Sequence, residues 1–156
     1  ATSSDEDGKI VELGAGTGAI TRFLAQRFSP QRLVIIERDA NLARHLRDQL
    51  PDHTVLTTDA RHFAQSLNGQ HCNAIVSALP LLSLPTEDRT AIIQAIAENL
   101  GPNGQLIQFT YGLGAPIPRR EAREFQLYGQ RKRYVLWNLP PATVWVYKLN
   151  AQRPSA

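Results

Sequence analysis

The chain has 156 residues, of which 42% are hydrophobic and 20% are charged. This length suits one domain, and it allows a hydrophobic core to form without disulfide bonds. Cys72 is the only cysteine, which excludes an intrachain disulfide and fits a reducing compartment. Residues 70–86 carry no Asp, Glu, Lys or Arg, but Pro80 and Pro85 interrupt them, so we do not expect a transmembrane helix there.

The composition of the two ends predicts the domain organisation. Residues 1–8 are small and polar and are interpreted as a flexible lead-in. Residues 9–149 are expected to form a single domain, followed by a tail at 150–156. Since no methionine stands at position 1, we expect that an N-terminal segment of the full protein is missing.

The net charge of +3 is distributed unevenly along the chain. Residues 1–116 hold nine basic and twelve acidic side chains, a balance of −3. Residues 117–156 hold eight basic and two acidic side chains, a balance of +6. A basic surface of this kind often meets phosphate, on nucleic acid or on lipid head groups. The alternative is a basic surface that is simply solvated.

Apolar runs and helical spacing predict an alternation of strands and helices. We expect buried strands at residues 9–13, 32–37, 53–58, 74–77 and 105–110. The intervening helices are expected at residues 19–28, 42–50, 61–67 and 86–100, with a turn at 101–104. This alternation is typical of a parallel sheet with helices on both faces. After Gly112 a basic segment covers residues 119–133, and residues 134–137 and 143–149 are expected to pair as an antiparallel end.

A glycine-rich turn separates the first strand from the first helix. It consists of Gly14, Ala15, Gly16, Thr17 and Gly18. Glycine at such positions permits backbone angles closed to other residues and lets a ligand approach the main chain. By itself the turn is ambiguous, because a dinucleotide-binding fingerprint also fits it.

Three acids near the predicted strand ends narrow this choice. Glu12 lies two residues before the turn, where a carboxylate repels a pyrophosphate and favours a cationic sulfonium ligand. Glu37 ends the second strand, where an acid can accept both hydroxyl protons of a ribose. Asp59 follows the third strand and can accept a hydrogen bond from an adenine amino group. The structural alternatives are a capping or turn-stabilising acid for Glu12, an exposed strand end for Glu37 and an N-cap for Asp59.

The combined pattern E-x-G-x-G-x-G, with an acid after each of the next two strands, resembles the class I S-adenosylmethionine-dependent methyltransferases over about residues 9–110. The resemblance implies a Rossmann-like α/β fold, with a mostly parallel central sheet, an antiparallel C-terminal strand and helices on both faces. It implies S-adenosyl-L-methionine as the cofactor and no metal. The residues implied to bind the cofactor are Glu12, Gly14, Ala15, Gly16, Thr17, Gly18, Glu37, Arg38, Asp59, Ala60 and Ser77.

The end of the fourth strand usually faces the transferred methyl group in this fold. Enzymes that methylate an aromatic amine place Asn or Asp there, then Pro-Pro or Leu-Pro, then an aromatic ring that stacks on the base. Here Ser77 replaces the Asn and Leu81 stands where the ring would be. We therefore expect a poor site for a flipped base and an apolar one suited to an aliphatic substrate.

Three segments sharpen the resemblance. V-S-A-L-P-L-L-S-L-P at 76–85, Q-F-T-Y-G at 108–112 and N-L-P-P-A-T-V-W at 138–145 are similar to the bacterial phospholipid N-methyltransferases. That family methylates phosphatidylethanolamine stepwise towards phosphatidylcholine. The resemblance implies a cytoplasmic protein held peripherally at the inner membrane surface. Members usually carry an N-terminal amphipathic segment, which this sequence does not show.

The resemblance also suggests how the acceptor site works. Tyr111 is expected to orient the amine and, with Ser77, to act in catalysis, although a tyrosine packed at a strand end is an equal alternative. The predicted substrate-binding residues are Leu79, Pro80, Leu81, Tyr111, Arg119 and Arg120. The two arginines are expected to take the lipid phosphate, and Arg131, Lys132 and Arg133 to meet either that phosphate or an anionic membrane. Plain surface charge is the alternative for all five basic residues, and Pro140 and Pro141 are expected to shape a turn.

Two other functions remain open from the sequence. An RNA adenine dimethyltransferase would suit the basic C-terminal part. Ser77, Leu81 and the lack of an added RNA-binding domain speak against it, so we do not expect a nucleic acid partner. A non-catalytic cofactor-binding protein is the other alternative, against which the preserved acids argue.

Overall fold

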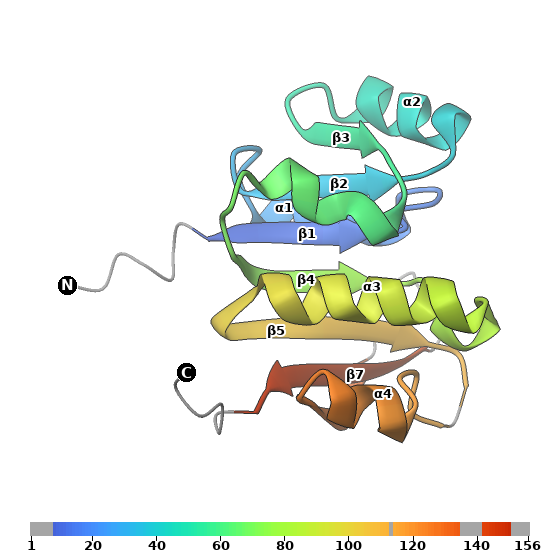
Figure 1. Cartoon of the computed structure of the whole chain (residues 1–156). Helices are drawn as coiled ribbons and strands as arrows, with labels where there is room; N and C mark the ends of the chain where they lie inside the picture. Colours follow the sequence, from blue (N-terminus) through green and yellow to red (C-terminus); the bar gives the residue numbers. More distant parts are fainter. Residues whose placement is uncertain (1–7, 113, 135–141, 151–156) are drawn as a thin grey trace.

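The computed structural model describes residues 8–112, 114–134 and 142–150. Within them, seven strands form one sheet in the order β3-β2-β1-β4-β5-β7-β6 (Figure 1). The strands are β1 (Lys9–Leu13), β2 (Leu33–Glu37), β3 (Thr54–Thr57), β4 (Cys72–Ser77), β5 (Leu100–Thr110), β6 (Leu127–Tyr134) and β7 (Ala142–Leu149).

Strands β1 to β5 run parallel, and β7 lies antiparallel between β5 and β6. From β1 the chain winds outward through β2 to β3 and then returns to place β4 on the other side of β1. The strand order therefore reverses between β1 and β4. In open α/β sheets, ligands bind in the crevice at the carboxyl ends of the strands at such a point.

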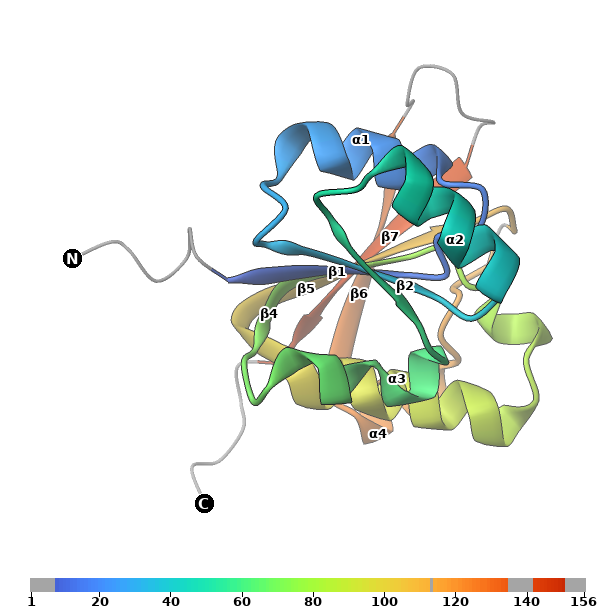
Figure 2. The same cartoon turned by 90° about the horizontal axis from the view of Figure 1, so that it is seen from above.

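Helices cover both faces of the sheet (Figure 2). Helices α1 (Ala19–Arg27) and α2 (Ala40–Gln49) lie on one face. The 3₁₀ helix η1 (Ala60–Leu67), α3 (Thr86–Asn99) and the short α4 (Arg119–Glu124) lie on the other, and a second 3₁₀ turn, η2 (Leu81–Ser83), precedes α3. This arrangement confirms the predicted Rossmann-like α/β fold, with its mostly parallel sheet and antiparallel C-terminal strand.

The core consists of two apolar layers, one on each face of the sheet. Successive side chains of β1 lie in different layers, because successive residues of a strand point to opposite faces of the sheet. Ile10 packs in the layer under α1 and α2, whereas Val11 and Leu13 pack in the layer under η1 and α3. By the same alternation Glu12 points towards the α1 face, and this places a carboxylate in an otherwise apolar layer.

Two sequence predictions about the second half of the chain were wrong. The turn expected at 101–104 belongs to β5, whose register against β4 shifts between Cys72 and Ala74. The basic segment does not precede the antiparallel end but forms α4 and β6, so the partner of β7 lies earlier than predicted. Charged residues suit β6 because it is an edge strand, where they discourage pairing with another chain. Residues 135–137 of the predicted strand lie outside the described residues.

Candidate active site

The glycine turn lies at the carboxyl end of β1, next to the point where the strand order reverses. Gly14, Gly16 and Gly18 have φ angles of 73°, 57° and 90°, in the left-handed region. At Gly14 space is also short, because a Cβ atom there would lie 2.6 Å from a side-chain carbon of Leu79. The turn therefore brings the backbone of β1 into contact with the segment that follows β4.

Glu12 is buried beneath this turn, with 2% of its surface exposed. Burial raises the pKa of its carboxyl to about 7, and the neighbouring charge of Glu37 adds to this, whereas the Thr21 side chain acts in the opposite direction. Its Oε2 has no hydrogen-bond partner among the residues that the structure describes. Glu12 does not cap the next helix, since the N-cap of α1 is Gly18 and no side chain caps this helix. Glu12 is therefore a buried acid whose hydrogen bonds are incomplete and whose carboxyl keeps its proton up to about pH 7.

Glu37 links the end of β2 to the glycine turn. Its Oε2 accepts a hydrogen bond of 2.7 Å from the Gly16 amide, and its Oε1 accepts one of 2.9 Å from the Asp39 amide. The side chain is buried, so the alternative of an exposed strand end was wrong. Each carboxylate oxygen can accept a second hydrogen bond, which leaves capacity for ribose hydroxyls.

Asp59 follows β3 and caps η1 by accepting a 2.8 Å hydrogen bond from the Arg61 amide. Its carboxylate also pairs with the Arg61 guanidinium at 3.0 Å, and this contact holds the pKa of Asp59 below its usual value. Arg61 reaches Asp88 at the start of α3 as well, again at 3.0 Å. The capping role considered from the sequence is confirmed, and the contact with adenine stays a prediction.

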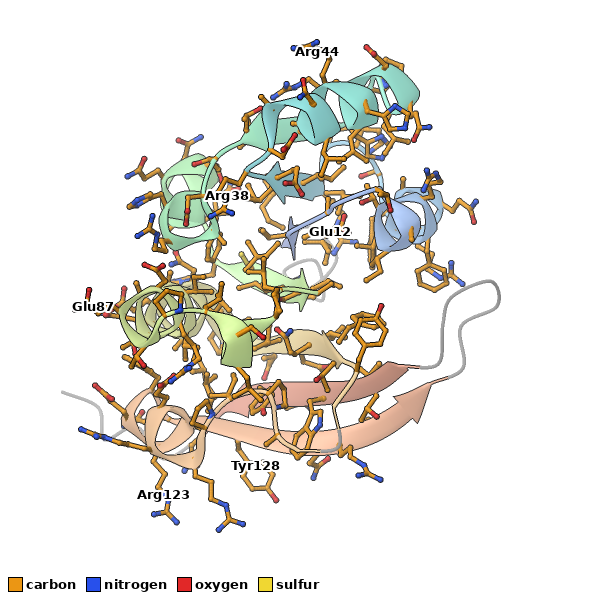
Figure 3. All side chains as sticks on the ribbon, turned by 90° about the vertical axis from the view of Figure 1, so that its right-hand side faces the viewer. Glu12, Arg38, Arg44, Glu87, Arg123 and Tyr128 are labelled. Carbon is orange, nitrogen blue, oxygen red and sulfur yellow. The ribbon has the colours of Figure 1, made fainter. Side chains whose placement is uncertain are left out.

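A cavity of about 250 Å³ lies against these groups. Its lining includes Gly14, Glu37, Arg38, Asp59 and Ala60 from the predicted cofactor residues, together with Leu79 and Pro80. Figure 3 looks onto the carboxyl ends of the parallel strands, with Glu12 near the centre of the sheet and Arg38 on its η1 side. The structure therefore brings together the ends of β1, β2 and β3, as the sequence pattern predicted.

The other predicted cofactor residues lie in the glycine turn, beneath it, or at the end of β4. Ala15 and Gly18 are buried in the turn, whereas Thr17 is exposed. Ser77 ends β4 with none of its surface exposed, and its Oγ accepts a 3.2 Å hydrogen bond from the Leu79 amide. Its hydroxyl thus shapes the segment after β4, and a contact with the cofactor stays a prediction.

A second cavity, of about 440 Å³, lies on the other side of Leu79 and Pro80. Its wall is mostly apolar, and it is lined by Ala78, Leu79, Pro80, Leu81, Leu82, Ser83, Gln108, Phe109, Thr110, Tyr111, Gly112 and Pro116. Leu79 and Pro80 line both cavities, so they separate the predicted cofactor side from the predicted acceptor side.

Side chains at this second cavity differ in exposure in a way that sequence spacing did not predict. Leu81, predicted to bind substrate, is 2% exposed and packs in the core, whereas its neighbour Leu82 is 56% exposed. Tyr111 is 79% exposed, so the alternative of a packed tyrosine was wrong. Leu82 and Tyr111 are therefore the large hydrophobic side chains at this cavity that are open to solvent.

Gln108 was quoted only as part of a motif and was given no role from the sequence. It lies on β5 beside Ser77 of β4 and is completely buried. Its Nε2 donates hydrogen bonds of 2.9 Å to the Leu79 carbonyl and 3.0 Å to the Phe109 carbonyl. The sequence offered one signal that could have singled out Gln108. It is a polar residue two positions after Leu106, so it points to the same buried face of the strand.

The basic residues lie on α4 and β6. Arg119 and Arg120 are exposed in the first turn of α4, which a buried ion pair of 2.8 Å between Glu121 and Arg89 attaches to α3. Arg131 and Lys132 are exposed on β6. The side chain of Arg133, and Pro140 and Pro141, lie outside the described residues.

Comparisons with known proteins identify the family. The family profile described as "Methyltransferase domain" matches residues 10–104. The chain is 32% identical over 142 residues to an ornithine lipid N-methyltransferase from Singulisphaera acidiphila, covering 85% of this chain and 71% of that protein. This chain belongs to the S-adenosylmethionine-dependent methyltransferase family.

Other relatives of this methyltransferase chain have different names. It is 31% identical over 135 residues to a ribosomal RNA small subunit methyltransferase A from Polaromonas, covering 84% of this chain but only 39% of that protein. A TehB-like SAM-dependent methyltransferase from Corynebacterium glutamicum matches its structure with a TM-score of 0.67 at 20% identity, over 92% of this chain and 81% of the other. That structural likeness shows the shared fold.

The residues of the first cavity fit S-adenosylmethionine, the cofactor of this methyltransferase family. Glu37 and Asp59 provide carboxylate oxygens for hydroxyl and amino groups, and the turn leaves open space beside the backbone at Gly16. Glu12 lies buried beneath the turn and is not among the residues that line this cavity, so its contact with the cofactor stays a prediction. Among the described residues, no group of three or more His, Cys, Asp or Glu is placed to hold a metal. In the same part of the chain, no helix is both long and apolar enough to span a membrane.

Proposed function

We propose that this methyltransferase methylates the amino group of a membrane lipid, with phosphatidylethanolamine converted stepwise towards phosphatidylcholine. An ornithine lipid, which also carries a primary amine, is the second candidate within the same substrate class. The similarity to an ornithine lipid N-methyltransferase supports the class.

One observation carries the proposal: an apolar cavity shares the Leu79 and Pro80 wall with the cofactor cavity and has exposed apolar side chains on its rim. Leu82 and Tyr111 offer contacts to acyl chains and to a head group entering from solvent. Leu81 is buried at the position where an aromatic ring would stack on a base. These features favour a flexible amine that brings its own anchors over a flat nucleobase.

S-adenosylmethionine supplies, when bound, a methyl group on a positively charged sulfur. The chain has to bring a neutral amine nitrogen in line with that group and exclude water. Counted from the ammonium form of the amine, each methylation would form one N–C bond, break one C–S bond and release one proton to solvent. Hydrogen bonds from Leu79 to Ser77 and from Gln108 to the Leu79 carbonyl fix the wall between the two cavities. Tyr111, at the rim, is proposed to orient the amine.

The basic part of the chain is proposed to hold the enzyme peripherally on anionic lipid. Arg119 and Arg120 follow Pro116, which lines the acceptor cavity, and they are proposed to bind the lipid phosphate. Arg123 and Tyr128 project outward at the edge of the molecule formed by α4 and β6 (Figure 3). Attachment through basic side chains weakens as salt rises, which distinguishes it from insertion of an apolar segment.

The test is methyl transfer from radiolabelled S-adenosylmethionine to three acceptors offered separately. These are vesicles containing phosphatidylethanolamine, vesicles containing an ornithine lipid, and ribosomal RNA. We expect label in extracted lipid and none above background in RNA. Label in RNA and none in either lipid would replace the lipid function with RNA adenine methylation, and no transfer to any acceptor, together with intact cofactor binding, would favour a non-catalytic protein.

A further inference from the structure

The carboxamide of Gln108 is the buried polar group of the acceptor side whose hydrogen bonds are incomplete. Both hydrogen bonds of its Nε2 go to backbone carbonyls, those of Leu79 and Phe109. Because a carbonyl only accepts, the nitrogen of the amide must face these two atoms, and the orientation of the amide is chemically fixed. Its Oε1 is buried and has no partner in the part of the chain that the structure describes.

An unpartnered amide oxygen in a protein interior costs free energy, so it calls for a ligand or a water. Gln108 lines the acceptor cavity, and its amide nitrogen donates a hydrogen bond to the carbonyl of Leu79. Leu79 lines both cavities. The Gln108 amide therefore lies next to the wall between the two cavities, and a substrate amine reaches its buried oxygen only where the lining of the acceptor cavity moves aside. We propose that Oε1 of Gln108 accepts a hydrogen bond from an N–H of the substrate amine and orients the nitrogen towards the cofactor. This inference rests on the proposed methylation of a lipid amine.

The number of N–H bonds on the substrate makes the proposal specific. A neutral primary amine and its monomethyl product each carry at least one N–H, whereas a neutral dimethylamine carries none. An amide oxygen accepts hydrogen bonds but does not take up protons at neutral pH. Gln108 thus assists the first and second methylations and contributes no such contact to the third. It acts as a specificity determinant for how far the substrate is methylated.

The experiment compares the wild type with Gln108→Met, which keeps the side-chain length and removes the amide. Phosphatidylethanolamine and its monomethyl and dimethyl derivatives are offered in separate vesicles, and kcat and KM are measured for each. We expect kcat for the first two lipids to fall about tenfold or more, the scale of one lost hydrogen bond. The rate with the dimethyl lipid should fall much less, so the ratio of dimethyl to unmethylated rates should rise about tenfold.

Ser77→Ala is the matched control, because it removes the other hydrogen bond that holds Leu79 but leaves the Gln108 amide in place. It should change the three rates by the same factor. The affinity for S-adenosylhomocysteine, measured by calorimetry, should be the same in Gln108→Met and in the wild type. Equal losses on all three lipids in Gln108→Met would overturn the inference while leaving the proposed function standing. A wild type that methylates none of the lipids would instead overturn the proposed function.

Discussion

The two cavities that share the Leu79 and Pro80 wall differ in the polar groups that they offer to a ligand. On the cofactor side, the acids Glu37 and Asp59 are fixed by hydrogen bonds from backbone amides. The rest of the lining is mostly apolar in both cavities, and on the predicted acceptor side exposed side chains such as Leu82 form the rim. Directional bonds suit a ligand of constant shape, whereas an apolar surface suits lipids of varied chains. The difference implies that a substitution on one side should weaken the use of one ligand and leave the binding of the other unchanged.

Substitution in the glycine turn should have the largest effect. Gly14→Ala combines a left-handed φ with a Cβ placed 2.6 Å from Leu79, so both strain and collision oppose it. We expect a loss of about 2–5 kcal/mol in the free energy of unfolding, by adding the costs of the two effects. Denaturant unfolding measures this loss, and calorimetry with S-adenosylhomocysteine should show weaker binding.

Gly16→Ala is the matched control for Gly14→Ala. Its φ is also left-handed, but a Cβ at this position meets no atom within 4 Å. It should cost only the conformational part, about 1–2 kcal/mol. Equal losses in the two variants would mean that contact between the turn and Leu79 does not matter.

The buried Glu12 should make stability depend on pH. The folded protein keeps this proton up to about pH 7, whereas the unfolded chain loses it near the ordinary value of 4.5. The stabilising contribution is therefore complete below the unfolded pKa and is lost as pH rises through 7. The expected loss is about 3 kcal/mol in the free energy of unfolding. Glu12→Gln should abolish this dependence and be the more stable protein at pH 8.

Two comparisons sharpen the test of Glu12. Glu124→Gln, at an exposed position of α4, should keep the pH dependence of the wild type. The wild type should also bind the cationic S-adenosylmethionine better, relative to uncharged S-adenosylhomocysteine, as pH rises through 7. A Glu12→Gln variant that retains the stability slope of the wild type would assign that slope to another group.

Glu37→Ala should weaken cofactor binding by about 1.5–3 kcal/mol, the scale of a hydrogen bond to a charged group. The neighbouring Asp39→Ala is the control, since it removes the cap of α2 but leaves the carboxylate of Glu37 in place. It should cost about 1 kcal/mol of stability without changing the affinity for S-adenosylhomocysteine. The role of Glu37 would be refuted by unchanged affinity in Glu37→Ala.

Charge reversal on β6 should have the smallest effect per residue. Arg131→Glu and Lys132→Glu should each weaken binding to anionic vesicles by about 1 kcal/mol, and the wild type should detach as salt rises. Vesicle sedimentation at several salt concentrations measures this. Glu124→Lys, which adds positive charge on α4, should strengthen attachment. Equal binding of the wild type to neutral and anionic vesicles at every salt concentration would refute electrostatic attachment.

The cofactor side could be predicted from the sequence because its groups follow strand ends. Glu37 ends β2 and Asp59 follows β3, and parallel strands bring such positions to one edge of the sheet. The acceptor side could not be predicted in the same way. Whether Leu81 or Leu82 is exposed depends on how η2 packs against the core, and spacing alone does not determine this.

The role of Gln108 and the course of β6 also depend on tertiary contacts. Gln108 acquires its partners only when β5 lies beside β4 and the segment containing Leu79 folds over it. The position of β6 depends on Gly129, because the ring of Tyr147 on β7 fills the space where a side chain would lie. Charge clustering predicted a basic surface there, but it gave no indication of a strand.

The most direct test of the division between the two sides measures two quantities in Glu37→Ala and in Leu82→Asp. They are the Kd for S-adenosylhomocysteine and the rate of methyl transfer to phosphatidylethanolamine vesicles. Leu82→Asp should keep the Kd of the wild type and lose at least about tenfold in transfer, because it removes an exposed apolar contact from the rim and puts there a negative charge that repels the lipid phosphate. Glu37→Ala should raise the Kd. Unchanged lipid methylation in Leu82→Asp would contradict the account.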